Sequence, residues 1–381
     1  MNIGIPKEIA PGETRVALTP SVVPQLIKNK YQVLVEHDAG LAAACSDEHY
    51  RQAGATIVAD TLALYQSSDL ICKVQSPQQH PVLNKHEAEF LREGSAIIGF
   101  LSPLSNLQAV NTFVRRKISS FSLEFVPRIT RAQSMDALSS MATVAGYRAV
   151  LLAAGELPKM FPLLMTAAGT VPPATVLILG AGVAGLQAIA TAKRLGAKVE
   201  VFDPRPAVKE QVKSLGAAFV DIDVQENVET SGGYAKEQSD AFLKLEREVI
   251  SARLKKTDVV ICTAQIFGKK APVLITKEMV NLMHPRSVII DLAAEQGGNC
   301  ELTEAGKSVR QNGVLIIGAV NLPAQLPIDS SQMYAKNVSN LITNLYDAQG
   351  ALRFDDEITK GCCITYNGEI LNALVKSTIQ S

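Results

Sequence analysis

The sequence predicts an α/β protein made of two Rossmann-like domains, each with a doubly wound parallel sheet. Short apolar runs alternate with helical patterns along most of the chain, as expected for strand–helix–strand units. Hydrophobic residues make up 47% of the chain and charged residues 19%, which suits strands that are buried on both faces. The length of 381 residues exceeds one ordinary core and is about right for two domains.

The first third of the chain alternates the two patterns. Short apolar and β-branched runs predict strands at residues 1–5, 33–36, 70–74, 96–100 and 119–123. Apolar residues at helical spacing predict helices at residues 20–29, 86–92 and 107–115. This order predicts a parallel sheet in the first domain.

A long helix and a connector are expected to link this sheet to a second one. Residues 137–155 contain Ala, Met and Leu without helix breakers, and a stretch rich in Pro and Gly follows them. Strands are then expected at residues 175–179, 198–203, 216–220, 259–262, 287–292 and 314–318, with a helix at 182–195. A helix at 334–345, before a tail that ends at 371–376, is expected to pack back on the first domain. The expected domains are residues 1–136 with 325–381, and residues 137–324 including the linking helix.

Charge and cysteine content argue against several classes of protein. Lys and Arg together number 37, as do Asp and Glu, so no basic field is present to attract nucleic acid. The six scattered cysteines have neither a CxxC nor a zinc-ligand spacing, so we expect reduced structural thiols and no metal site. The N-terminus does not resemble a signal peptide, and no uncharged apolar run of about 18 residues predicts a membrane span.

The most specific local pattern is a glycine-rich turn between a strand and a helix. Gly180, Gly182 and Gly185 fit the G-x-G-x-x-G fingerprint, with Val183 and Ala184 inside it. The first glycine permits a tight turn, the second lets a pyrophosphate approach the backbone, and the third allows close packing of helix on strand. The unpaired amides of the helix start would face the phosphates. These residues therefore predict a dinucleotide site.

An acidic residue at the end of the next strand indicates which dinucleotide is bound. The Asp203 carboxylate can accept hydrogen bonds from the adenosine ribose and would repel a 2′-phosphate, which favours NAD over NADP. Pro204 and Arg205 follow it and are expected beside the cofactor. Arg205 is a counter-signal, because an arginine at this place can pair with a 2′-phosphate; the alternative is a solvated turn residue.

Several motifs resemble one family across essentially the whole chain. The opening GIPKE…ETRVALTPSVV, the fingerprint ending LGAKVEVFD, DLAAEQGGN at residues 291–299 and GAVNLP at residues 318–323 are its matches. The family contains alanine dehydrogenase and the NAD(H)-binding domain of proton-translocating nicotinamide nucleotide transhydrogenase. The resemblance implies two Rossmann-like domains with the nucleotide cleft between them, and a homodimer.

One segment bears on which branch of the family the chain resembles. Alanine dehydrogenases place a lysine and a histidine for substrate binding and acid–base work; Lys73 and Arg15 are present here, but residues 99–106 contain no histidine. Histidine suits proton transfer near neutral pH, so its absence speaks against this chemistry. An alanine-type amino-acid dehydrogenase that uses NAD remains the alternative.

A second segment, residues 127–140, is similar to the arginine–glutamine–aspartate loop of the transhydrogenase NAD domain. By that resemblance Arg128, Gln133 and Asp136 position two nicotinamides against each other, and Ser139 is included with them as a catalytic residue. Read from the residues alone, the segment is a cation, an amide and an anion before a helix. A plain helix N-terminus capped by Ser134 or Asp136 is the alternative.

Two further places are expected to meet the cofactor. Residues 231–236 resemble the family's mobile loop, in which Gly233 and Tyr234 would close over the nucleotide; an ordinary exposed loop tip is the alternative. Ala264 and Gln265, after the strand at 259–262, are placed at the cofactor by topology and family likeness.

The resemblance implies an oxidoreductase that transfers hydride between its own NAD(H) and an NADP(H) bound by a partner beta subunit. Such transfer needs no protein nucleophile or metal. Coupling to protons implies a transhydrogenase membrane domain as a further partner, so this chain is expected to be cytoplasmic and peripheral to the inner or plasma membrane. A non-catalytic NAD(H)-sensing subunit is the second alternative.

Overall fold

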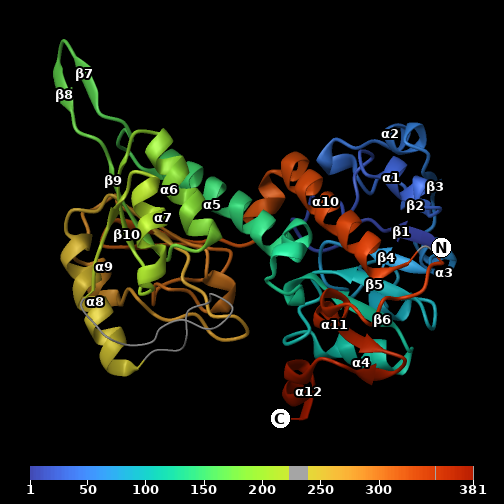
Figure 1. The fold of residues 1–381 in the computed structure, drawn as a ribbon. Helices are drawn as coiled ribbons and strands as arrows, with labels where there is room; N and C mark the ends of the chain where they lie inside the picture. The colour runs from blue at the N-terminus through green and yellow to red at the C-terminus, as the bar shows by residue number, and fades with distance from the viewer. Residues whose placement is uncertain (223–238, 348, 381) are drawn as a thin grey trace. The chain divides into compact units, whose positions relative to one another are not determined.

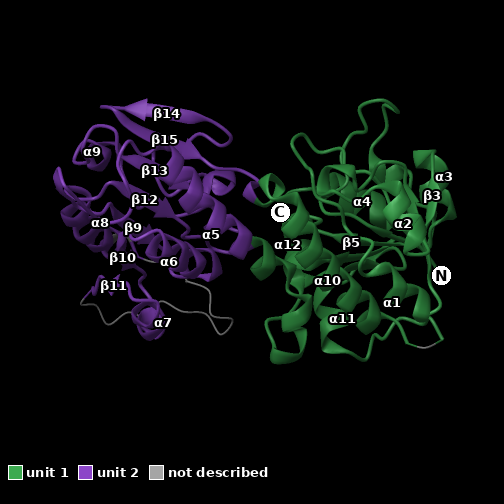
Figure 2. Ribbon diagram, turned by 90° about the horizontal axis from the view of Figure 1, so that it is seen from above, with its two compact units in different colours: residues 1–141, 323–381 green, residues 142–322 purple. Residues whose placement is uncertain are grey.

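The computed structural model describes residues 1–222, 239–347 and 349–380, and it contains two compact units (Figures 1 and 2). Unit 1 consists of residues 1–141 and 323–381, and unit 2 of residues 142–322. The first boundary falls inside helix α5, Ala137–Glu156, and not at the start of this helix as predicted.

Unit 1 is built on an eight-stranded sheet with the order β17-β16-β6-β5-β4-β1-β2-β3. The strands are β1 Asn2–Ile5, β2 Gln32–Glu36, β3 Thr56–Val58, β4 Leu70–Cys72, β5 Ala96–Gly99, β6 Ser119–Ser122, β16 Cys363–Tyr366 and β17 Glu369–Ile370. Neighbours from β3 to β6 are parallel, and β16 and β17 extend the sheet in antiparallel pairs. The edge strands β3, β16 and β17 were not predicted, because each is short and close to polar turns.

The helices of unit 1 are α1 Val23–Lys28, α2 Asp47–Gln52, α3 Thr61–Ser67, α4 Leu107–Arg115, α10 Pro327–Leu345, α11 Glu357–Cys362 and α12 Ala373–Gln380. The helix predicted at 86–92 is wrong: only a single 3₁₀ turn, Glu87–Glu89, forms there. The Glu87 side chain turns inward to the amine of Lys73 and the hydroxyl of Tyr65, so side-chain bonds and not a helix fix this segment.

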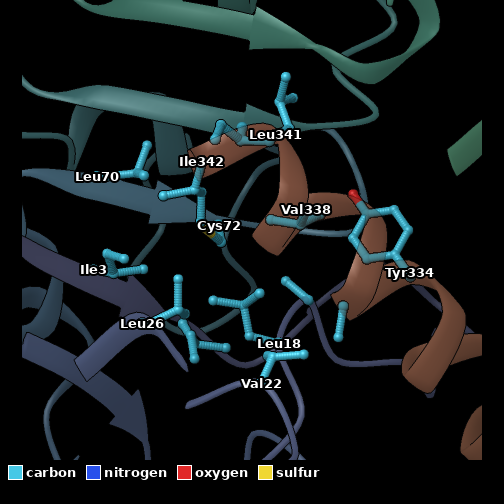
Figure 3. Packing of buried hydrophobic residues seen from close by; sticks show 14 of the residues in the cluster. Ile3, Leu18, Val22, Leu26, Leu70, Cys72, Tyr334, Val338, Leu341 and Ile342 are labelled. Carbon is cyan, nitrogen blue, oxygen red and sulfur yellow. The ribbon is translucent and has the colours of Figure 1, made fainter. Parts of the chain in front are cut away.

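Helix α10 supplies a large part of the unit 1 core (Figure 3). Tyr334, Val338 and Leu341 lie against strand and helix residues that include Ile3 and Leu26. The expected packing of a closing helix on the first domain is confirmed. The helix begins at Pro327, earlier than predicted, and its first turns bury polar side chains whose hydrogen bonds are made within unit 1.

Unit 2 contains a seven-stranded sheet with the order β11-β10-β9-β12-β13-β15-β14. Its strands are β9 Thr175–Leu179, β10 Lys198–Phe202, β11 Ala218–Phe219, β12 Val259–Cys262, β13 Val288–Asp291, β14 Ser308–Gln311 and β15 Val314–Gly318, and its helices are α6 Val183–Arg194, α7 Lys209–Ser214, α8 Asp240–Leu254 and α9 Lys277–Val280. All strand pairs are parallel except β14 with β15. Strand β9 lies between β10 and β12, so the strand order reverses there, and this is where ligands of open α/β sheets bind.

The connector after α5 is not irregular as predicted. It contains the hairpin β7 Leu164–Thr166 and β8 Gly169–Val171, which extends away from the rest of unit 2 (Figure 1). Met165 at its tip is 82% exposed, and Leu163 at its base is 54% exposed.

Helix α5 is long and apolar enough, by length and composition alone, to cross a membrane. The sequence predicted no such segment, because Arg148 interrupts the uncharged run. In the structure Ala149, Val150 and Ala153 of this helix belong to the unit 2 core. The second half of helix α5 therefore has the place of a core helix within unit 2.

Candidate functional site

The glycine-rich turn connects β9 to α6 as the fingerprint predicts. Gly180 has a φ of +99°, a conformation that L side chains rarely adopt. Gly182 is the N-cap of α6 without a side-chain cap, and a Cβ built there would meet nothing within 4 Å. The helix start therefore leaves amides and open space together, which fits a pyrophosphate.

The third glycine and a glycine of α5 fix the position of this helix start. A Cβ at Gly185 would lie 2.0 Å from the Gly180 carbonyl oxygen, so only glycine allows α6 to approach the turn. A Cβ at Gly146 would lie 2.1 Å from the Ala184 carbonyl oxygen on the other side. The role of Gly185 in close packing is the one that the sequence predicts, whereas Gly146 carried no sequence signal.

Asp203 lies directly after β10, below the glycine turn. Its Oδ2 accepts hydrogen bonds from the Ala181 amide at 2.6 Å and from Arg205 Nη2 at 2.7 Å. Its Oδ1 accepts from the Arg205 amide and from Arg205 Nε, both at 2.9 Å. The Asp203 side chain is 2% exposed and that of Arg205 is 12% exposed. Arg205 is therefore not the solvated turn residue that the sequence left open as an alternative.

The loop after β12 joins the glycine turn. Thr263 Oγ1 donates to the carbonyl oxygens of Leu179 and Gly180, at 3.2 and 3.0 Å. The next residue, Ala264, donates its amide to Asn299 Oδ1 at 3.0 Å, and Asn299 Nδ2 donates to the Ala264 carbonyl at 2.8 Å. Ala264 thus lies at the same sheet edge as the turn and Asp203, and Asn299 holds its peptide from both sides. Gln265 follows it and donates to the Leu292 carbonyl at 2.9 Å.

Asp291, at the end of β13, organises the segment that carries Asn299. Its carboxylate accepts hydrogen bonds from the amides of Ala293, Asn299 and Cys300, and from Thr303 Oγ1 at 2.6 Å. Burial raises the pKa of Asp291, although these donors oppose the shift. The DLAAEQGGN match therefore contains a scaffold that supports the cofactor loop through Asn299.

The segment at 127–140 lies in unit 1 and forms the 3₁₀ turn Thr130–Met135 before α5. Arg128 and Gln133 are exposed, while buried Ala132 and Met135 fix the turn in the core. Asp136 Oδ1 accepts from the Ser139 amide at 2.8 Å, and Oδ2 from the Ser139 hydroxyl at 2.6 Å. Asp136 thus caps α5, which is the structural role named as an alternative for it. Its cofactor-positioning role stays a prediction, as do those of Arg128, Gln133 and Ser139.

Lys73, which an alanine dehydrogenase would use for a substrate carboxylate, is fully buried and paired. Its Nζ lies 2.8 Å from Glu87 Oε1 and 3.3 Å from Glu8 Oε2. Desolvation opposes the charge of Lys73, but the two carboxylates outweigh it and raise the lysine's pKa. Burial raises the pKa of Glu8. The Lys73 ammonium is therefore neutralised within the unit 1 core.

Arg15 lines a cavity of about 260 Å³ in unit 1, together with Lys7, Glu8 and Glu13. Arg15 forms a fork with Glu13, with Nε 2.7 Å from Oε1 and Nη2 2.6 Å from Oε2. Burial opposes ionisation of Glu13, but the bonds and charge of Arg15 prevail and lower its pKa to about 2. The cavity carries carboxylates beside its cations, so it is poorly suited to a carboxylate substrate.

Two of the predicted cofactor residues, Gly233 and Tyr234, lie outside the described residues. Among the described ones, Gly180, Gly182, Val183, Ala184, Gly185, Asp203, Pro204, Arg205, Ala264 and Gln265 gather at the carboxyl ends of β9, β10 and β12 in unit 2. Thr263 and Asn299 were missed. Asn299 stands in the quoted DLAAEQGGN match, and that match is the signal that could have identified it.

Comparison with known proteins gives matches over the whole chain. The N-terminal domain model of "Alanine dehydrogenase/PNT" matches residues 4–145, and the C-terminal domain model matches residues 149–373. The chain is 47% identical over 377 residues to the first of the chains that form NAD(P) transhydrogenase subunit alpha in Rhodospirillum rubrum, covering 98% of each chain. It is 45% identical to NAD(P) transhydrogenase subunit alpha of Haemophilus influenzae, over 97% of this chain and 71% of that protein. Alanine dehydrogenase of Methanococcus maripaludis is 32% identical, over 85% of this chain and 81% of that protein.

Solved structures match in the same way. A transhydrogenase from Sinorhizobium meliloti has a TM-score of 0.86 and 40% identity, covering 97% of this chain and 100% of that one. An L-alanine dehydrogenase has a TM-score of 0.80 at 24% identity, covering 100% of this chain and 99% of that one, which shows the shared fold.

Proposed function

The chain belongs to the alanine dehydrogenase/PNT family, and we propose that it is the NAD(H)-binding component of a proton-translocating NAD(P) transhydrogenase. Hydride would pass between its NAD(H) and an NADP(H) bound by a partner beta subunit. The observation that carries the proposal is the glycine turn of β9 and α6 with the Asp203 carboxylate below it, in a chain that matches a transhydrogenase alpha subunit over 98% of its length.

Each part of the turn has a role in holding NAD(H). The helix start at Gly182 offers amides to the pyrophosphate, and Asp203 faces the adenosine ribose. Asn299 fixes the Ala264 peptide, so this side of the site is rigid before the nucleotide arrives. The nicotinamide itself supplies the hydride chemistry, and the protein's task is to orient it and exclude water.

The segment with Arg128, Gln133, Asp136 and Ser139 is proposed to align the two nicotinamides. Gln133 is exposed and offers both a donor and an acceptor, as a carboxamide requires. Asp136 and Ser139 bond each other at the start of α5, which makes the backbone next to Gln133 a fixed platform.

Alanine dehydrogenation is disfavoured by the state of the residues that would perform it. Lys73 is buried between two glutamates, and Arg15 is engaged by Glu13. Freeing either cation for a substrate would leave buried carboxylates without a partner, at a cost of roughly 3–5 kcal/mol.

Partners and location follow from the same proposal. We expect a membrane domain and an NADP(H)-binding subunit as partners, and a cytoplasmic location peripheral to the inner or plasma membrane. We also expect a homodimer. The hairpin β7–β8 supports it, because an isolated two-stranded hairpin is marginally stable in water and this one carries exposed Met165.

Reconstitution tests this function. The purified chain is mixed with the membrane domain and NADP(H)-binding subunit of a related transhydrogenase, and reduction of NADP⁺ by NADH is recorded. We expect exchange only in the full mixture, and no NADH formation from alanine and NAD by the chain alone. NADH formation from alanine would favour the dehydrogenase alternative. NADH binding without exchange in the full mixture would favour an NAD(H)-sensing subunit.

A further inference from the structure

Every acceptor position of the Asp203 carboxylate is occupied by a donor from unit 2. A carboxylate offers about four lone-pair positions. Arg205 fills three of them with its amide, Nε and Nη2, and the Ala181 amide fills the fourth. A ribose hydroxyl can therefore bond to Asp203 only after the Arg205 guanidinium has moved.

Withdrawal of the guanidinium would leave the carboxylate in place. The two backbone donors, the amides of Ala181 and Arg205, hold one oxygen each at 2.6 and 2.9 Å. The side-chain fork also occupies one position on each oxygen. Releasing it opens one acceptor per oxygen, which is the number that the two hydroxyls of an adenosine ribose require.

We propose that Arg205 is a specificity-determining latch on Asp203. A ribose with both hydroxyls free donates to the two acceptors and replaces the guanidinium. A 2′-phosphorylated ribose lacks one donor and brings negative charge to Asp203, so it cannot open the latch. This inference rests on the proposed NAD(H) site and adds the residue that keeps NADPH out.

The same geometry makes Arg205 a masked phosphate receptor. Arginine binds phosphates in the forked manner in which it binds carboxylates. In Asp203→Asn the amide offers a single acceptor oxygen and an NH₂ group that faces other donors, so the fork is lost. Arg205 then becomes available to the 2′-phosphate.

A double-mutant cycle by calorimetric titration of NADH and NADPH into the full chain tests the proposal. The proteins are wild type, Arg205→Gln, Asp203→Asn, Asp203→Asn with Arg205→Gln, and Asp203→Asn with Lys213→Gln. Lys213 is an exposed lysine of α7 whose removal deletes the same charge from the same unit. The wild type should prefer NADH, and Asp203→Asn should bind NADPH at least about 10-fold more tightly than wild type, more so at low salt.

The second substitution decides what produced the gain. It should disappear when Arg205→Gln is added and persist with Lys213→Gln. Arg205→Gln alone, which keeps both backbone donors to Asp203, should bind NADH a few-fold more tightly because no competitor remains.

Two results would overturn the latch. One is an equal NADPH gain in Asp203→Asn with and without Arg205. The other is weaker NADH binding in Arg205→Gln that retains the wild-type circular dichroism spectrum. A wild-type chain that binds no NADH would instead refute the proposed function. If Asp203→Asn does not fold, the NADH titration of Arg205→Gln decides alone.

Discussion

The α-carbon of Gly146 in α5 faces the Ala184 carbonyl oxygen in the first turn of α6, so closely that a Cβ at Gly146 would lie 2.1 Å from it. The two helices therefore touch backbone to backbone at the end of α6 that is proposed to face the pyrophosphate. Any side chain at residue 146 must displace that helix start.

Gly146→Ala should destabilise the protein and weaken NADH binding together. Forcing a methyl group into this contact should cost about 1–3 kcal/mol of unfolding free energy. Gly155→Ala is the matched control on the same helix, since a Cβ there meets nothing within 4 Å and alanine favours a helix by about 1 kcal/mol. Urea unfolding and NADH titration of both variants measure the difference. Equal stability of Gly146→Ala and wild type would mean that the contact is looser than described.

Gln133→Asn should slow hydride transfer and leave NADH affinity nearly unchanged. The shorter side chain keeps the amide but withdraws it by one methylene, and misplacement of that size can cost roughly 10- to 100-fold in rate. The reconstituted exchange reaction and NADH titration separate the two effects. Gln52→Asn, an exposed amide of α2, is the control and should change neither quantity. A collapse of NADH binding in Gln133→Asn would make Gln133 a ground-state binding residue.

The Glu13–Arg15 fork should contribute stability that is lost in acid. The pKa of Glu13 is lowered from 4.5 to about 2, so the folded state holds the charged form more strongly than the unfolded state does. The contribution is complete above the unfolded pKa and disappears as pH falls from 4.5 towards 2, by about 3 kcal/mol in all.

Glu13→Gln has no such titration. The gap in unfolding free energy between wild type and Glu13→Gln should therefore narrow as pH is lowered from neutral into this window. Glu93→Gln, whose carboxylate is 66% exposed, serves as the control and should stay parallel to wild type. A gap for Glu13→Gln that did not change with pH would contradict the lowered pKa.

Met165→Asp should shift the protein from dimer to monomer if the hairpin β7–β8 is part of the proposed homodimer. A charge at the centre of an apolar interface is costly to desolvate. Val82→Asp places the same charge at another exposed apolar residue, 77% exposed, and should leave the assembly unchanged. Sedimentation velocity of the two variants distinguishes them. A dimer that survives Met165→Asp would exclude the hairpin tip from the interface.

Periodic, apolar elements could be predicted from the sequence, and elements fixed by side-chain contacts could not. Strands β9 and β12 and helix α4 have the predicted bounds, because burial on both faces or along one face leaves a clear pattern. The segment at 86–92 has helical spacing too, but Glu87 is drawn into the ion pair with Lys73, which lies 14 residues before it.

The site divides in the same way. The glycine turn and Asp203 follow from local pattern, since each residue acts through its own backbone or strand position. Thr263 and Asn299 act on residues 83 and 35 positions away in sequence, and such pairing becomes visible only when the sheet has brought the strand ends together. The fork of Arg205 on Asp203 spans only two residues, yet the sequence could not tell it from a solvated arginine.

The return of α10 to the core of unit 1 sets an order for biosynthesis. Tyr334, Val338 and Leu341 are synthesised after the whole of unit 2, yet they fill the centre of a domain whose first strand is Asn2–Ile5. On the ribosome, the second unit can fold while the first still has an open apolar face. The amino-terminal unit is therefore the last to mature, and its exposed face is where a chaperone would be needed during translation.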